Sequence, residues 1–262
     1  MKYYDQHLHT YLSFDSTETF ENYLEKGAET FVSTDHFDLN NPYSNFKDDI
    51  PDYEEYTKKL AALSEVYETK LLKGIEIGVV PGQEEAIVDF LNQRTYDVKI
   101  MSIHQNGKFD YMDPIVKKKP KLDVAREYFE QMDTVLDTFS QGNILAHFDY
   151  GLRQLDLSAS ELEEHFEPIL TKLFRKVITR QMGFELNAKS FVKYHNAELY
   201  RYAVPLYTSL GGKLFTLGSD AHVAEDYQLG FSEMSSLLKS NGITQLVVFQ
   251  DNEQYMTDMP EV

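Results

Sequence analysis

The feature that most constrains the fold is an alternation of two kinds of segment along the chain. Short apolar or β-rich runs recur, and each is followed by a longer amphipathic stretch. This order is typical of a parallel sheet whose strands are joined by helices, so the fold class is α/β. Seven strands are predicted, at residues 2–9, 30–35, 70–77, 97–104, 143–149, 184–187 and 213–220, and an eighth run at 246–249 is predicted as an edge or closing strand.

Helical patterns fill the gaps between the predicted strands. Between residues 52 and 69, for example, Tyr56, Leu60 and Leu63 fall three or four positions apart and form an apolar stripe. No Ser-rich or low-complexity linker divides the chain, so residues 1–262 are predicted to form a single domain. The predicted helices are at residues 17–26, 52–69, 83–94, 122–138, 158–180, 198–210 and 231–240.

Charge and composition limit the classes of function. The 262 residues carry a formal net charge of -18, which repels polyanions and disfavours a general nucleic-acid binder. An anionic substrate then requires a local positive source, such as bound metal ions, in one cleft. Cysteine is absent, so thiolate metal sites are excluded. Neither a signal-peptide core nor a membrane-length apolar run occurs, which predicts a cytoplasmic protein with no membrane contact.

The histidines are concentrated at the ends of predicted strands. His7 and His9 end the first strand as H-x-H, so their side chains point to the same face. Six of the eight histidines lie at such ends, whereas His165 and His195 do not. Sites in parallel barrels form where the carboxyl ends of the strands converge. The strand-end residues are His7, His9, His36, Glu76, His104, His147, Asp149, Asp220 and His222.

Imidazole and carboxylate without thiolate is a ligand set that hard and borderline divalent metals favour. Six histidines with Glu76, Asp220 and Asp15 exceed the three or four protein ligands of a single catalytic zinc ion. A carboxylate such as Glu76 can bridge two ions. The sequence therefore predicts a cluster of two or three divalent ions, with zinc, manganese and iron as the candidates.

These motifs together resemble the polymerase and histidinol phosphatase (PHP) family of metal-dependent phosphoesterases. They occur in the family's order along almost the whole chain. The resemblance implies a distorted (β/α)7 barrel, a single PHP-type catalytic domain and a trinuclear metal centre at the carboxyl ends of the strands. The matching motifs are H-L-H-T at 7–10, T-D-H at 34–36, G-I-E at 74–76, S-I-H at 102–104, A-H-F-D at 146–149 and G-S-D-A-H at 218–222.

The resemblance also implies which residues hold each ion. Glu76 bridges the first two ions. The third takes Asp15 from the loop after His9, where many family members have histidine. The implied ligands are His7, His9, Glu76 and Asp220 for the first ion, Glu76, His104 and His147 for the second, and His36, His222 and Asp15 for the third.

Stand-alone family members of this size act on L-histidinol phosphate, so the resemblance implies a phosphatase of histidine biosynthesis that releases L-histidinol and phosphate. Attack by a metal-bridging hydroxide would hydrolyse this small phosphate monoester, with Glu76, Asp220 and His222 as catalytic residues. Arg153 and Lys189 are candidates for phosphate binding, although each could be a surface cation.

Two acidic residues near the ligands have a different predicted role. Asp35 and Asp149 are expected to orient ligand histidines rather than to bind metal. The longest irregular segment, 105–121, contains three consecutive lysines and is either a solvated loop or a lid near an anionic ligand.

Three alternatives to this function stay open. The first is a PHP-type phosphoesterase for another small phosphate ester or a nucleotide. The second is an amidohydrolase-type barrel, although the position of Glu76 and the spacing of Asp220 and His222 do not follow that pattern. The third is a metal-binding scaffold without activity. Nothing in the sequence specifies the oligomeric state.

Overall fold

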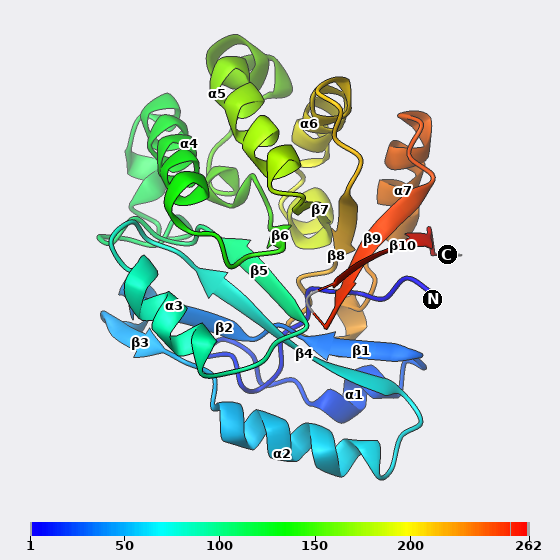
Figure 1. Ribbon diagram of the computed structural model, residues 1–262. Coiled ribbons are helices and arrows are strands. Elements are labelled where there is room, and N and C mark those ends of the chain that lie inside the picture. Colours follow the sequence, from blue (N-terminus) through cyan, green and yellow to red (C-terminus); the bar gives the residue numbers. More distant parts are fainter. Residues whose placement is uncertain (1, 252, 261–262) are drawn as a thin grey trace.

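A computed structural model describes residues 2–251 and 253–260 and contains a curved, mainly parallel sheet (Figure 1). The strand order is β3-β2-β4-β5-β6-β7-β8, and β1 also pairs with β4. All of these pairs are parallel except β2 with β3. The strands are β1 (Thr30–Ser33), β2 (His36–Asn41), β3 (Lys47–Asp49), β4 (Lys70–Gly78), β5 (Val98–Ser102), β6 (Ile144–Leu145), β7 (Gly183–Asn187) and β8 (Phe215–Gly218).

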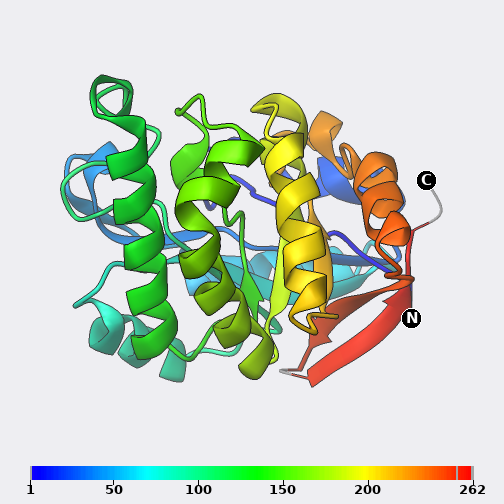
Figure 2. The same cartoon turned by 90° about the horizontal axis from the view of Figure 1, so that it is seen from above.

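Helices cover the outside of this sheet, with α4, α5 and α6 side by side (Figure 2). The longest, α5, begins at a capping box in which Ser158 and Glu161 bond each other's backbone N–H groups. Its buried residues include Leu162, Phe166 and Leu170, which repeat every fourth position and face the core. The helices are α1 (Phe20–Leu24), α2 (Tyr53–Ser64), α3 (Glu84–Asn92), α4 (Lys121–Thr138), α5 (Ala159–Thr179), α6 (Ala197–Ser209) and α7 (Phe231–Ser240).

The N-terminal segment closes the gap between the two ends of the sheet. Asp220 N donates to His7 O at 2.9 Å on the β8 side, and Thr34 N donates to Leu8 O at 2.7 Å on the β1 side. Since β1 and β2 share one position beside β4 and β3 pairs only with β2, the segment takes the seventh position of a distorted barrel. The predicted strand at 2–9 is nevertheless wrong as a regular strand, since its only β-pairing within the described residues is an isolated bridge between Leu8 and Ala221.

Side chains replace the missing backbone ladder of this segment. The Gln6 side-chain amide donates to Val247 O and accepts from Phe249 N, both at 2.9 Å, as a neighbouring strand would. Asp5 Oδ1 accepts from Ser219 N at 3.1 Å. These buried polar side chains satisfy backbone groups of the strands beside them, so the segment is fixed without a regular strand.

Other differences from the predicted strands lie around the edges of the sheet. The strand is interrupted at residues 34–35, so the predicted strand at 30–35 ends early. Beyond the interruption, β2 runs beside β4 and then turns back into β3. Neither β2 nor β3 is predicted, because their polar residues lack an apolar alternation. The run at 246–249 forms β9 (Gln245–Gln250), which pairs antiparallel with the unpredicted β10 (Glu253–Asp258).

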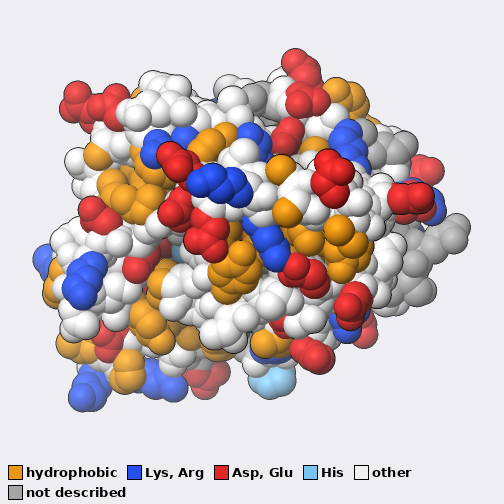
Figure 3. All heavy atoms as spheres, turned by 90° about the horizontal axis from the view of Figure 1, so that it is seen from below, with side chains coloured by type: hydrophobic (Ala, Val, Ile, Leu, Met, Phe, Trp, Pro, Cys, Tyr) orange, Lys and Arg blue, Asp and Glu red, His pale blue; other side chains and the backbone are white. Residues whose placement is uncertain are grey.

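The surface agrees with the acidic composition. On the face seen in Figure 3, basic side chains stand between acidic and hydrophobic ones rather than forming a continuous basic area. Within the described residues, no helix is long and apolar enough to cross a membrane.

Candidate metal centre

The nine predicted ligands meet at the carboxyl ends of the parallel strands. His7 and His9 come from the N-terminal segment, Glu76 comes from β4, and the others come from β2 or from loops. Salt-bridge-range contacts connect all nine into one cluster. Sets of three whose ligand atoms lie within 4.8 Å of one another are His9, His36 and His222; His7, His9 and Glu76; His7, His147 and Asp220; and His36, Glu76 and His104.

Glu76 is the centre of the cluster and is completely buried. Its Oε1 atom lies 3.0 Å from His104 Nε2 and 2.9 Å from His147 Nε2, and it accepts from Ser102 Oγ at 2.6 Å. Burial raises the pKa of Glu76, but the surrounding histidines more than offset this and hold it well below the ordinary value. The carboxylate therefore stays ionised.

The second oxygen of Glu76 faces a different set of imidazoles. Oε2 lies 3.2 Å from His7 Nε2, 3.4 Å from His9 Nε2 and 3.1 Å from His36 Nδ1. All four of these atoms are buried and have no hydrogen-bond partner within the described residues. Buried polar atoms are normally paired, so their convergence indicates a ligand between them. Imidazole nitrogens and a carboxylate oxygen fit a divalent metal ion there.

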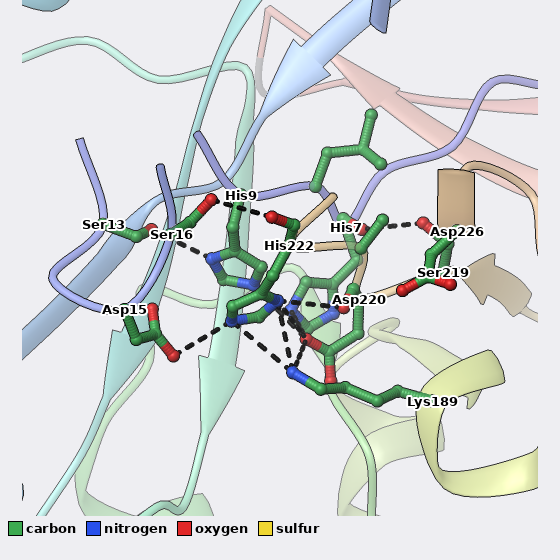
Figure 4. Close-up of polar contacts among 12 residues, drawn as sticks. His7, His9, Ser13, Asp15, Ser16, Lys189, Ser219, Asp220, His222 and Asp226 are labelled. Carbon is green, nitrogen blue, oxygen red and sulfur yellow. Dashed lines mark hydrogen bonds and ion pairs between the residues drawn. The ribbon is translucent and has the colours of Figure 1, made fainter. Parts of the chain in front are cut away.

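Asp220 lies opposite Glu76 on the loop that follows β8. Its Oδ1 atom is 3.5 Å from His9 Nε2 and 3.4 Å from Lys189 Nζ (Figure 4). Its backbone has a φ of 54°, in the left-handed region that non-glycine residues seldom adopt. Burial raises the pKa of Asp220, but Lys189 and His7 more than offset this and lower it well below the ordinary value. Backbone strain such as the positive φ of Asp220 is typical of functional sites.

A third group lies at the outer side of the cluster. Asp15 Oδ2 is 3.0 Å from His222 Nε2, and Asp15 Oδ1 is 3.6 Å from His36 Nε2. The His9 ring packs against the rings of both His36 and His222, with centroid distances of 4.3 and 4.1 Å. Burial lowers the pKa of His36, but Asp15 and Glu76 more than offset this and raise it to about 9. Asp15 therefore lies where a ligand from the loop is predicted.

Glu185, which the sequence analysis missed, orients two of the histidines. Its Oε1 lies 2.7 Å from His7 Nδ1, and its Oε2 accepts from His147 N at 2.9 Å. A Cβ atom on Gly218 would overlap Glu185 Oε1, so the carboxylate occupies space that only glycine leaves open. A lone carboxylate inside the predicted apolar strand 184–187 was the available signal for this role.

Two other histidines have similar partners. Asp38 Oδ1 lies 3.0 Å from His104 Nδ1, and this contact was also missed because β2 is not a predicted strand. Ser13 Oγ lies 3.0 Å from His9 Nδ1 and donates to Asp35 Oδ1 at 2.9 Å. Asp35 therefore reaches a ligand ring only through Ser13. Partners of this kind fix the tautomer and direction of ligand histidines.

The structure places Asp149 in a different environment from that of Asp35. It accepts hydrogen bonds from Tyr200 Oη and Asn196 Nδ2, both at 2.7 Å. These bonds join the loop after β6 to α6, and within the described residues the Asp149 side chain has no hydrogen bond to a histidine ring of the cluster.

Arg153 and Lys189 bring positive charge to the same cavity. Arg153 is buried, its Nη2 donates to Asp220 Oδ2 at 3.0 Å, and its guanidinium carbon lies 4.8 and 5.0 Å from the ring centroids of Tyr150 and Tyr194. Both cations line a cavity of about 170 Å³ together with several of the histidines. Arg153 is therefore not the surface cation that the sequence left open.

The loop between β5 and α4 forms part of this cavity. Asp110 and Met112 line it, whereas Lys117, Lys118 and Lys119 do not. The part of the irregular segment 105–121 that reaches the site therefore carries a carboxylate, and the three lysines lie elsewhere on the loop.

Fold and site together define a parallel α/β barrel with a histidine and carboxylate cluster that can hold several metal ions. The chain belongs to the PHP domain family, which matches residues 5–189. The match confirms the resemblance drawn from the motifs and favours a PHP-type site over the amidohydrolase-type alternative.

Individual relatives match along nearly the whole chain. The histidinol-phosphatase of Lactococcus lactis is 27% identical over 258 residues, which is 95% of each chain. The crystal structure of histidinol phosphate phosphatase from Lactococcus lactis, complexed with zinc, L-histidinol and phosphate, matches with a TM-score of 0.86. That match covers 96% of this chain and 98% of the other at 24% identity, and it confirms the predicted fold class.

Proposed function

We propose that this protein is a metal-dependent phosphomonoesterase that hydrolyses L-histidinol phosphate to L-histidinol and phosphate. The observation that carries the reaction class is the Glu76 carboxylate, because its two oxygens face two different sets of imidazole nitrogens. A carboxylate shared in this way suits a bridge between two ions. The substrate is supported by the name of the Lactococcus lactis relative, which matches over 95% of both chains.

The proposal assigns all nine clustered side chains to metal binding. Zinc, manganese and iron all accept this mixture of nitrogen and oxygen donors. When bound, such ions lower the pKa of water and neutralise phosphoryl oxygens. The proposed ligands are His7, His9, Glu76 and Asp220 for the first ion, Glu76, His104 and His147 for the second, and His36, His222 and Asp15 for the third.

The protein's own cations are proposed to hold the phosphate. Arg153 and Lys189 both contact Asp220 and line the cavity, so a phosphate beside Asp220 would lie within reach of both. They also supply local positive charge in a chain whose net charge is -18. Asp220, with its lowered pKa, remains an anion beside them and fixes their direction. With Glu76 and His222, Asp220 makes up the proposed catalytic set.

The proposal treats residues 1–262 as one catalytic domain that works in the cytoplasm. A charged phosphate ester does not cross a bilayer unaided, so an enzyme acting on such a metabolite works in the compartment that holds it. The partner is a small molecule, and neither nucleic acid nor a membrane is part of the proposal.

Phosphate release from a panel of substrates tests this function. L-Histidinol phosphate is compared with glycerol phosphate, a nucleotide monophosphate and a phosphodiester, on protein whose metal content is measured in parallel. Strong preference for L-histidinol phosphate, with two to three ions per chain, is the expected result. Preference for a nucleotide or another ester would replace the substrate but keep the reaction class. Protein that binds no metal would overturn both.

A further inference from the structure

Two loops bring three of the proposed ligands to the cluster. Asp15 lies in the loop at residues 10–19, called the Asp15 loop, and Asp220 and His222 lie in the loop at residues 219–224, called the His222 loop. Asp15 Oδ2 and His222 Nε2 are 3.0 Å apart. The proposed site of the third ion therefore exists only while the two loops keep one relative position.

Glu18 connects these loops through a carboxylate, although only 8% of the residue is exposed. Its Oε2 atom accepts from Ala224 N at 2.6 Å, across the two loops. Its Oε1 atom accepts from Thr19 N at 2.8 Å and from the side-chain amide of Asn22, which hold the carboxylate at the start of α1. Hydrogen bonds from N–H groups to an ionised carboxylate are about twice as strong as those between neutral groups. The end of the Asp15 loop is therefore fixed to the end of the His222 loop.

Two hydroxyl groups complete this connection. Ser16 Oγ donates to His222 O at 3.0 Å (Figure 4). Tyr23, on α1, is completely buried, and its hydroxyl lies 2.8 Å from Ala221 O and 3.1 Å from His9 O. The tyrosine thus joins the backbone of the N-terminal segment to that of the His222 loop, at residues that are or adjoin proposed ligands.

The backbone conformation of the His222 loop needs such support. Asp220 has a φ of 54°, and a strained conformation of this kind persists only where the surrounding structure imposes it. Tyr23 at Ala221 O and Glu18 at Ala224 N hold the backbone directly after Asp220. Neither side chain lines the cavity of the metal cluster, so both act on the site through the backbone that carries the ligands.

We infer that Glu18 and Tyr23 are positioning residues that clamp the Asp15 loop to the His222 loop and thereby set the affinity of the third metal ion. The inference rests on the proposed function and deepens it, since it names what holds the outermost proposed ion site together. Without the clamp, Asp15 and His222 can move apart while Glu76, on β4, keeps its position.

Zinc titration of chelator-treated protein, in competition with a chromogenic chelator, measures the affinity of each ion. Glu18→Gln keeps the shape of the side chain but removes its charge, so the most weakly bound ion should bind about tenfold more weakly, as for loss of a charged hydrogen bond. Tyr23→Phe removes one hydroxyl and should weaken the same ion by about threefold. The tighter ions should keep wild-type affinity. Glu18→Gln combined with Asp15→Asn should weaken binding by less than the product of the two single effects, because both act on one loop contact.

Each variant has a matched control in the chain. Tyr56 is also buried, and its hydroxyl lies 3.0 Å from Ser33 O and 3.4 Å from Leu72 O, but these carbonyls belong to β1 and β4, which a regular ladder already holds together. Tyr56→Phe therefore removes a similar bridge away from the two loops. Glu25→Gln removes an exposed charge just after α1. Both controls should bind every ion with wild-type affinity.

The outcomes separate this inference from the proposed function. Wild-type affinity for every ion in both Glu18→Gln and Tyr23→Phe would overturn the inference alone. Equal weakening of all ions, together with a lower unfolding temperature of the metal-free variants, would also overturn it, because the two residues would then support the barrel in general. Wild-type protein with only two ions would overturn the inference and leave a two-ion phosphatase, whereas wild-type protein without metal would overturn both.

Discussion

The inner and outer parts of the metal cluster are held in different ways. In the inner part, His7 and His104 each present one nitrogen to Glu76, and buried Glu185 and Asp38 hold their other nitrogens. In the outer part, His36 and His222 both face Asp15, whose side chain is 28% exposed. Buried carboxylates on barrel strands therefore hold the inner side chains, whereas the contact that His36 and His222 share comes from Asp15 on a surface loop.

This difference implies a hierarchy of sensitivity. An inner ligand cannot move without disturbing buried hydrogen bonds from neighbouring strands, so its geometry is built into the fold. In the outer part, Asp15 can shift with the loop that carries it, and its contacts to His36 and His222 then change. We expect metal binding and activity to be lost more completely by changes in the inner part.

The largest effect is expected at Glu76. Glu76→Gln keeps the shape of the side chain but removes the charge that faces both sets of imidazoles, so at least one ion should be lost from purified protein. Turnover should fall by about a thousandfold, because loss of a single preorganised electrostatic contact already costs about 10²–10³ in kcat. Phosphate-release kinetics and metal analysis measure both. The exposed Glu68 offers a matched control in Glu68→Gln; near-normal turnover in chelator-washed Glu76→Gln would sink the mechanism.

Glu185→Gln tests whether the inner part depends on its orienting partners. The substitution removes the charge that holds His7 Nδ1 but leaves every proposed ligand in place. Metal affinity and activity should fall by about 10- to 100-fold, the usual cost of losing such a partner. Titration with zinc after chelation measures the affinity. Wild-type affinity would mean that the barrel positions His7 without help from Glu185.

Sequence reasoning found the side chains that converge in the cluster but missed the residues that hold them. The clustered side chains stood out because barrel sites form at the carboxyl ends of strands, a position that a short motif such as G-S-D-A-H marks. Glu185 lies within a strand and Asp38 within a strand that was not predicted, so neither stood out. Their role depends on contacts across the barrel, between residues 178 and 66 positions apart from their histidines.

The N-terminal segment shows a second limit. Its alternation predicts a strand, and the predicted alignment of His7 and His9 is present. Backbone hydrogen bonds of its described residues, however, form only near His7 to His9, and the side chains of Asp5 and Gln6 bond the neighbouring backbone before them. As neighbours in a strand, these two polar residues would point to opposite faces, so the sequence does not show that both are buried. Only the packed barrel shows that they are buried and pair with neighbouring backbone.

Asp15→Asn addresses the outer part and should have a smaller effect. The change removes one charged contact from His36 and from His222 but leaves Glu76 beside His36. Because Asp15 is partly exposed, we expect about a tenfold loss of affinity for the most weakly bound ion, at the low end for a charged contact. The other ions should keep wild-type affinity. Equal weakening of all ions would contradict the separation into inner and outer parts.

The smallest effect concerns pH and metal-free protein. The pKa of His36 is raised to about 9 in the folded chain, against about 6.5 for an unperturbed histidine. The folded state therefore binds the proton more tightly, so its contribution to stability is complete below about pH 6.5 and is lost as pH rises through 9. Between pH 8 and pH 9 the free energy of unfolding should fall by about 1 kcal/mol, because over this range the folded state still holds most of one proton that the unfolded state lacks.

Denaturant unfolding of chelator-treated protein at these two pH values measures that loss. Asp15→Asn supplies the comparison, because without the Asp15 charge the pKa of His36 is no longer raised as far and less of the proton is retained at pH 8. The variant should therefore be less stable than wild type at pH 8 but nearly equal to it above pH 9. A constant difference across this range would show that Asp15 holds the outer part by packing and hydrogen bonding rather than by its charge on His36.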